Sequence, residues 1–121
     1  MITGFSPAPV KPLVPMSVLA SLDIRLGRIE AVDDVPGSKK LVRLVVNFGD
    51  HTRRILAGMK QERPDLNVLV NRQALFVVNL EPRKMAGEIS EGMLFDIGYP
   101  DGLPPALAVP EHPLPDGARA G

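Results

Sequence analysis

The chain has 121 residues, of which 45% are hydrophobic and 23% charged, which is the balance of one folded domain rather than of a disordered or membrane-embedded chain. Its 14 Lys and Arg residues equal its 14 Asp and Glu residues in number, so a protein that coats nucleic acid through bulk positive charge is disfavoured. Because the net charge is zero, any contact with nucleic acid must come from a local basic patch. The absence of cysteine excludes a disulfide scaffold, a thiol nucleophile and a Cys-ligated zinc site.

Proline divides the chain into three parts. Four of the 13 prolines lie in residues 1–15 and six in residues 98–121, which predicts a proline-rich arm over 1–15, a folded domain over 16–98 and a proline-rich extension over 99–121. The apolar stretch 11–22 is a poor signal peptide because two prolines interrupt it, and no run of 18 apolar residues exists to span a bilayer. We therefore expect a cytoplasmic protein with no membrane partner. A short helical turn capped by Ser17 is expected before the first strand.

The first predicted strand runs from Asp23 to Asp33 and changes its apolar phase partway along. Ile24 and Leu26 share one phase, and Ile29 starts another after the slip at Gly27-Arg28. A glycine at a phase slip is typical of a β-bulge, which bends a long strand so that it serves two segments of a sheet.

The next segments predict a hairpin. In the strand 41–48, apolar residues alternate with Arg43 and Asn47, which is the pattern of a half-buried strand. Gly49-Asp50 turns the chain into a second strand over 52–57.

Two further strands complete the set. The segment 74–80 is almost wholly apolar, so both of its faces should be covered, by the core or by a partner chain. Asn71 before it is suited to a left-handed turn that ends a short helix. A last strand over 93–97 places Met93, Phe95 and Ile97 on one face. Five strands, a long bent first one and short helical turns predict an all-β fold, a five-stranded oligonucleotide/oligosaccharide-binding (OB) barrel.

Patterns for catalysis and cofactors are weak. The stretch 37–40 lacks the spacing of a phosphate-binding P-loop, and Ser90 has neither a nearby histidine nor a nucleophile elbow around it. The acidic residues lack the spacing of a calcium loop, and the two histidines, His51 and His112, lack ligand spacing. We therefore expect no enzyme activity, no cofactor and no metal.

Basic residues cluster beside the predicted strands, at Lys39-Lys40, Arg53-Arg54 and Arg83-Lys84. Gathered on one rim of a barrel, such clusters would form a surface that follows phosphates. The phenylalanines of the strands fall at core positions, which leaves almost no aromatic platform for unstacked bases. A nucleic-acid ligand should therefore be recognised as a folded RNA through its backbone shape.

Five short motifs occur in a set order. They are Asp23-Ile-Arg-Leu-Gly-Arg-Ile29, Gly37-Ser-Lys-Lys-Leu41, Ile55-Leu-Ala-Gly58, Asn79-Leu-Glu-Pro-Arg-Lys-Met-Ala-Gly87 and Ser90-Glu-Gly-Met93. Together they resemble the tRNA-binding domain shared by the C-terminal region of bacterial methionyl-tRNA synthetase, free-standing tRNA-binding proteins and a secretion-related chaperone. The resemblance covers about 16–98 and continues into the C-terminal segment.

This resemblance implies a homodimeric OB barrel that holds folded tRNA and performs no chemistry, with an aminoacyl-tRNA synthetase as a further partner. Arg and Lys would neutralise phosphates, and Asn and Ser would donate neutral hydrogen bonds. The predicted tRNA-binding residues are Lys39, Lys40, Arg43, Arg53, Arg54, Asn79, Arg83, Lys84, Ser90 and Met93. The motifs leave one alternative open, a dimeric secretion-related chaperone that binds unfolded preproteins in the apolar groove between its two barrels.

Overall fold

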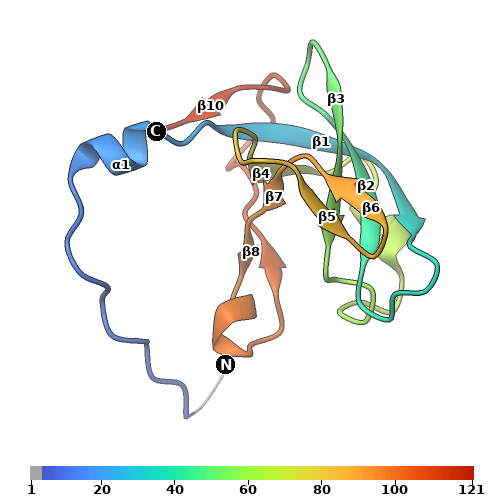
Figure 1. Ribbon diagram of the computed structural model, residues 1–121, viewed down its shortest axis with the longest axis horizontal. Helices are drawn as coiled ribbons and strands as arrows, with labels where there is room; N and C mark the ends of the chain where they lie inside the picture. Colours follow the sequence, from blue (N-terminus) through green and yellow to red (C-terminus); the bar gives the residue numbers. More distant parts are fainter. Residues whose placement is uncertain (1–3) are drawn as a thin grey trace.

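The computed structural model describes residues 4–121 and consists mainly of short strands (Figure 1). The strands are β1 (Ile24–Asp34), β2 (Val42–Asn47), β3 (Thr52–Ala57), β4 (Gln73–Val77), β5 (Arg83–Met85), β6 (Glu88–Ser90), β7 (Met93–Leu94), β8 (Asp96–Ile97), β9 (Ala106–Leu107) and β10 (Arg119–Ala120). The helical segments are α1 (Met16–Ala20) and two 3-10 turns, η1 (Leu66–Leu69) and η2 (Tyr99–Asp101).

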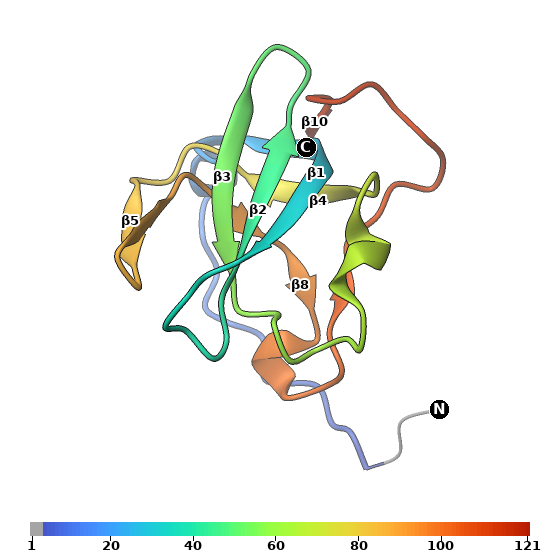
Figure 2. The same ribbon diagram turned by 90° about the vertical axis from the view of Figure 1, so that its right-hand side faces the viewer.

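One antiparallel sheet, in the order β3-β2-β1-β4-β7, curls into an open barrel (Figure 2). The two edges of the sheet, β3 and β7, approach each other. The amide of Glu91, just before β7, donates to the carbonyl of Arg54 in β3 at 2.9 Å. Phe76, Leu44 and Ile55 fill the interior and are fully buried. This five-strand path confirms the predicted OB-type barrel, to which β10 adds a sixth strand beside β1.

Strand β1 serves two segments of the sheet, as predicted. Its first half pairs with β4 and its second half with β2. The predicted position of the bulge is wrong, because pairing with β4 is regular through Gly27 and Arg28, and the register shifts instead between Ile29 and Ala31. The glycine is needed for a close approach, since a Cβ on Gly27 would lie 2.5 Å from a Val46 methyl group.

The phase slip in β1 has a different cause from a bulge. Gly27 faces the barrel interior with its pairing partner Ala74, whereas Leu26 faces outward with Leu75. Leu26 is nevertheless buried, because the C-terminal segment 106–120 lies over this outer face. The strand therefore has apolar residues on both sides, and each side is covered by a different part of the chain.

We call the segment 106–120 the strap. The amide of Leu26 donates to the Ala118 carbonyl at 2.8 Å, and the amide of Gly117 donates to the Leu26 carbonyl at 2.7 Å. Side chains add to this attachment: Asp116 accepts from Arg28 at 3.2 Å and from Gln73 at 2.8 Å. The part of the chain expected to be an extension thus covers both β1 and β4.

Of the remaining local features, some lie where the sequence predicts them and others do not. The hairpin β2-β3 and the left-handed Asn71, with φ of 71°, are confirmed. The expected strand 93–97 is wrong as one piece: β7 pairs with β4 and β8 with β9, and Leu94 rather than Phe95 enters the core. Ser17 lies inside α1 and does not cap it, because the N-cap position is Pro15.

The N-terminal arm extends away from the barrel (Figure 1). Over residues 4–15 it has no helix or strand, and Leu13 is 98% exposed. Residues 1–3 of the predicted arm lie outside the described residues. Within 4–121, no helix has both the length and the apolar character that crossing a bilayer demands.

Candidate functional site

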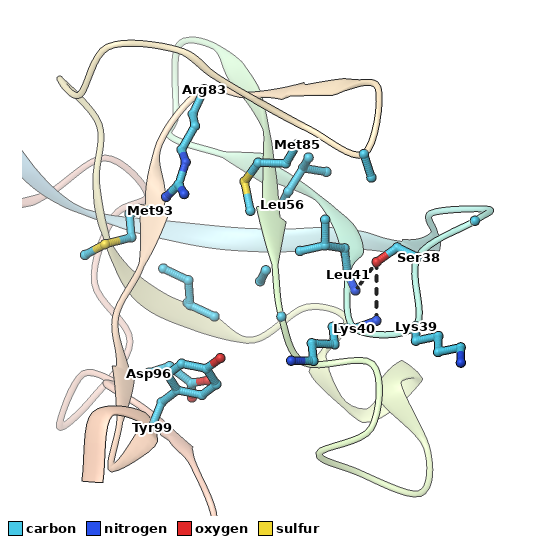
Figure 3. Close-up of a pocket in the computed structure, with 15 residues that line it drawn as sticks. Ser38, Lys39, Lys40, Leu41, Leu56, Arg83, Met85, Met93, Asp96 and Tyr99 are labelled. Carbon is cyan, nitrogen blue, oxygen red and sulfur yellow. Dashed lines mark hydrogen bonds between the residues drawn. The ribbon is translucent and has the colours of Figure 1, made fainter. Parts of the chain in front are cut away.

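A cavity of about 720 Å³ opens between the β5-β6 hairpin, the loop 37–41 and the turn η2 (Figure 3). We call it the hairpin cavity. Its apolar wall comes from Leu41, Leu56, Ala57, Met85, Met93 and Leu94. Three cations, Lys39, Lys40 and Arg83, lie around it. Within residues 4–121 none of the three takes part in an ion pair, so their charge is available to an anionic ligand.

The loop that carries the two lysines is held in place by hydrogen bonds of its own. The Ser38 hydroxyl accepts from the amide of Leu41 at 3.0 Å and from that of Lys40 at 3.3 Å. The ammonium group of Lys60 donates to the Val35 carbonyl at 3.2 Å and to the Ser38 carbonyl. Lys39 and Lys40 are thus exposed side chains on an ordered backbone.

The β5-β6 hairpin brings Arg83 to the opposite side of the cavity. Its two-residue turn, Ala86-Gly87, has positive φ at both positions, 49° and 81°. Such values suit the right-handed twist of a tight hairpin but strain an alanine. Because side chains alternate along a strand, Arg83 and Met85 face the cavity and Lys84 faces away.

Four of the predicted site residues are used inside the fold. Arg43 forms an ion pair with Glu88 at 2.6 Å. Arg53 donates to the carbonyls of residues 78 and 91 at 2.9 and 3.1 Å. Asn79 accepts from the amide of residue 23 at 2.7 Å and donates to the carbonyl of residue 21 at 2.8 Å, which ties the start of β1 to the end of β4. The Ser90 hydroxyl, in a residue only 4% exposed, accepts from the amide of residue 56 and donates to the carbonyl of residue 92, each at 3.0 Å.

The ten predicted residues therefore divide into groups. Lys39, Lys40, Arg83 and Met93 meet at the hairpin cavity. Lys84 and Arg54 are exposed but do not line the cavity.

Sequence reasoning missed Tyr99. It is the only tyrosine of the chain, lies on η2, lines the cavity and is 56% exposed. The sequence offered one usable signal, since this aromatic residue follows Gly98 beyond the predicted strands and so falls outside the core pattern. Its ring provides the aromatic face that the strand phenylalanines do not.

Two carboxyl groups meet beside the cavity, on Glu62 and Asp96. Glu62 Oε2 and Asp96 Oδ1 are buried, and within residues 4–121 neither has a hydrogen-bond partner unless the two groups share a proton. Burial raises the pKa of both carboxyl groups, and the neighbouring negative charge of Asp96 raises the pKa of Glu62 further. One proton shared between them would satisfy both oxygens and reduce the negative charge at the cavity wall.

This pair predicts a loss of stability as the pH rises. Because its pKa values are higher in the folded than in the unfolded chain, the pair contributes most below about pH 4, near the ordinary carboxyl values, and its contribution falls as pH rises through the raised values. Glu62→Gln supplies a permanent N–H donor, so we expect it to shrink the difference between urea midpoints at pH 5 and pH 8. An unchanged difference would show that the two carboxyls do not share a proton.

Comparison with known proteins agrees with this architecture. A family model described as "Putative tRNA binding domain" matches residues 24–119. The chain is similar to a MetRS related protein from Pyrococcus horikoshii, with a TM-score of 0.83 and 30% identity, over 92% of this chain and 100% of that chain. It is also similar to a CsaA chaperone protein from Picrophilus torridus, with a TM-score of 0.78 and 26% identity, over 90% of this chain and 100% of that chain.

A third likeness bears on the fold alone. The chaperone CsaA from Bacillus anthracis has a TM-score of 0.76 and 24% identity, over 91% of this chain and 100% of that chain. The family match, by contrast, runs from the first residue of β1 to the first residue of β10 and so takes in the barrel, the hairpin cavity and most of the strap. With that match over most of its length, the chain belongs to the tRNA-binding domain family.

Proposed function

We propose that this protein binds folded tRNA without catalysing a reaction and assists an aminoacyl-tRNA synthetase. The observation that carries the proposal is a set of three cations around the hairpin cavity, none of them ion-paired within the described residues 4–121, in a chain of this family. Cations on an ordered surface bind phosphates and fix the orientation of an RNA. The similarity to a MetRS related protein supports the synthetase partner, and a tRNA ligand would place the protein in the cytoplasm.

The salt dependence of tRNA binding tests the proposal. Three phosphate-binding cations in each of two protomers predict that log affinity falls against log salt with a slope of about −4 to −5, through release of counterions. Filter binding of folded tRNA between low and physiological salt would measure this slope. An affinity that does not change with salt would contradict phosphate recognition, since the net charge of the chain is zero and only a local patch can produce the effect.

We also propose that the protein is a homodimer. Apolar side chains on α1 and at the ends of β1 and β10 line a second cavity of about 750 Å³ on the outer side of the sheet. Leu19 and Met16 remain exposed there. Packing against a second copy of the chain would remove this apolar surface from water, and two-fold dimers are the commonest way in which proteins do so. Sedimentation equilibrium at micromolar concentration should give about twice 13.1 kDa, and a species of 13.1 kDa alone would reject the dimer.

A second candidate function is the binding of unfolded preproteins as a chaperone. The apolar wall of the hairpin cavity and the similarity to a CsaA chaperone protein favour it. Burial of apolar polypeptide is insensitive to salt or slightly strengthened by sulfate, the opposite of phosphate binding. Parallel titrations of folded tRNA and of an unfolded polypeptide, each across the same salt range, therefore separate the two functions.

A further inference from the structure

The hairpin cavity offers more than charge. Figure 3 draws Arg83, with Met85 and Leu56 beside it, at one end of the cavity and Tyr99 at the other end. Phosphate contacts alone need no apolar hollow, since a flat basic surface serves them equally well. A volume of about 720 Å³ lies within the range of pockets that enclose a small organic group, about 300–1,000 Å³. The hollow therefore has room for a part of the ligand other than its phosphates.

Tyr99 indicates the chemistry of that part. Its ring is 56% exposed on a short turn outside the apolar core, where burial does not account for it. An exposed aromatic ring on a pocket wall stacks well on another aromatic ring. Met85 and Met93 add polarizable sulfur atoms, which make favourable contacts with aromatic rings.

We infer that the hairpin cavity holds one unpaired nucleotide of the bound RNA, with its base against Tyr99 and the apolar wall and its phosphate at the cations. This inference rests on the proposed RNA-binding function and names what that site recognises. A nucleobase has apolar faces, and its phosphate carries the negative charge that Lys39, Lys40 and Arg83 complement. An apolar peptide would fit the wall and leave the cations without partners.

The nucleotide must be unpaired because the faces of a paired base are covered by its neighbours in the helix. Bases of loops and bulges can be turned out and stacked on aromatic side chains. The aromatic-poor sequence predicted recognition through backbone shape, and the cavity adds a contact with a base at one position. An RNA with a turned-out nucleotide should therefore bind more tightly than a fully paired one of the same charge.

Two RNA probes test the inference on the full-length protein. One is a stem with a single bulged 2-aminopurine, and the other is the same stem without the bulge but with a terminal 5′-phosphate, so that the two carry the same number of phosphates. The wild-type protein should bind the bulged stem more tightly, and the 2-aminopurine fluorescence should fall as the base stacks. Tyr99→Ala should lower affinity for the bulged stem about 5- to 150-fold, the effect of losing one stacked base, and remove the preference. Tyr99→Phe keeps the ring and should keep the preference.

The outcomes distinguish this inference from the function on which it rests. Equal affinity for the two stems, or fluorescence that does not change on binding, would overturn the nucleotide pocket and leave phosphate recognition intact. Failure to bind either stem or tRNA would overturn both. The comparison of the two stems on the wild-type protein needs no variant, so a folding defect in Tyr99→Ala could not obscure the result.

Discussion

Replacing Gly117 by alanine should detach the strap and lower the free energy of unfolding by about 2–4 kcal/mol. Gly117 has a φ of 91°, which strains any L side chain, and a Cβ there would lie 2.1 Å from the Phe48 carbonyl oxygen. The backbone must therefore shift, and it would lose the pair of hydrogen bonds that joins the strap to Leu26. Leu26 would then be exposed to water. Urea unfolding measures the loss, and limited proteolysis should cleave the strap sooner than in the wild type.

Gly102→Ala is the matched control. Gly102 also has a positive φ, 69°, but no atom lies within 4 Å of its Cβ position. Alanine there carries only the cost of the left-handed backbone, about 1–2 kcal/mol. Equal losses at the two positions would mean that the strap yields without losing its contacts, and that its close approach to Phe48 adds nothing to stability.

The double variant Lys39→Glu/Lys40→Glu should lower tRNA affinity at least about 100-fold at low salt. It replaces two cations with two anions beside the hairpin cavity, and like charges brought together at an interface cost several kcal/mol. The milder Lys39→Ala/Lys40→Ala should make the salt slope shallower by about 3, because a dimer loses four of its six phosphate-binding cations and each releases somewhat less than one counterion. Both lysines are exposed, so the barrel should remain folded, which circular dichroism checks.

A control of equal charge change separates local contact from net charge. Lys11 and Arg72 are exposed, and neither lines the hairpin cavity. Lys11→Glu/Arg72→Glu alters the net charge of the chain by the same amount as the test variant. Similar losses in the two double variants would show that tRNA responds to overall charge, and they would contradict a specific site at the loop 37–41.

The sequence by itself determined the barrel, because the signals for its strands are local. Alternation over 42–47 depends only on neighbouring residues, and it places Val42, Leu44 and Val46 in the core as predicted. Asn71 is likewise a short-range signal, since a left-handed residue is favoured by its own side chain. The ordered motifs led to the family for the same reason, as each occupies one short stretch.

Only the tertiary structure decided which polar residues are available to a ligand. Arg43 and Ser90 resemble surface contacts in the sequence, but their partners come from strands 45 and 34 residues away and occupy their polar groups. Leu26 faces outward and is buried by the strap, about 90 residues further along the chain. In the sequence, this apolar residue on the outer face is interpreted as a change of strand phase and hence as a bulge. Tyr99 joins Lys39 and Arg83 through packing of distant segments, for which no sequence period exists. Whether a side chain is used inside the fold depends on what the folded chain brings against it, and that information is not local.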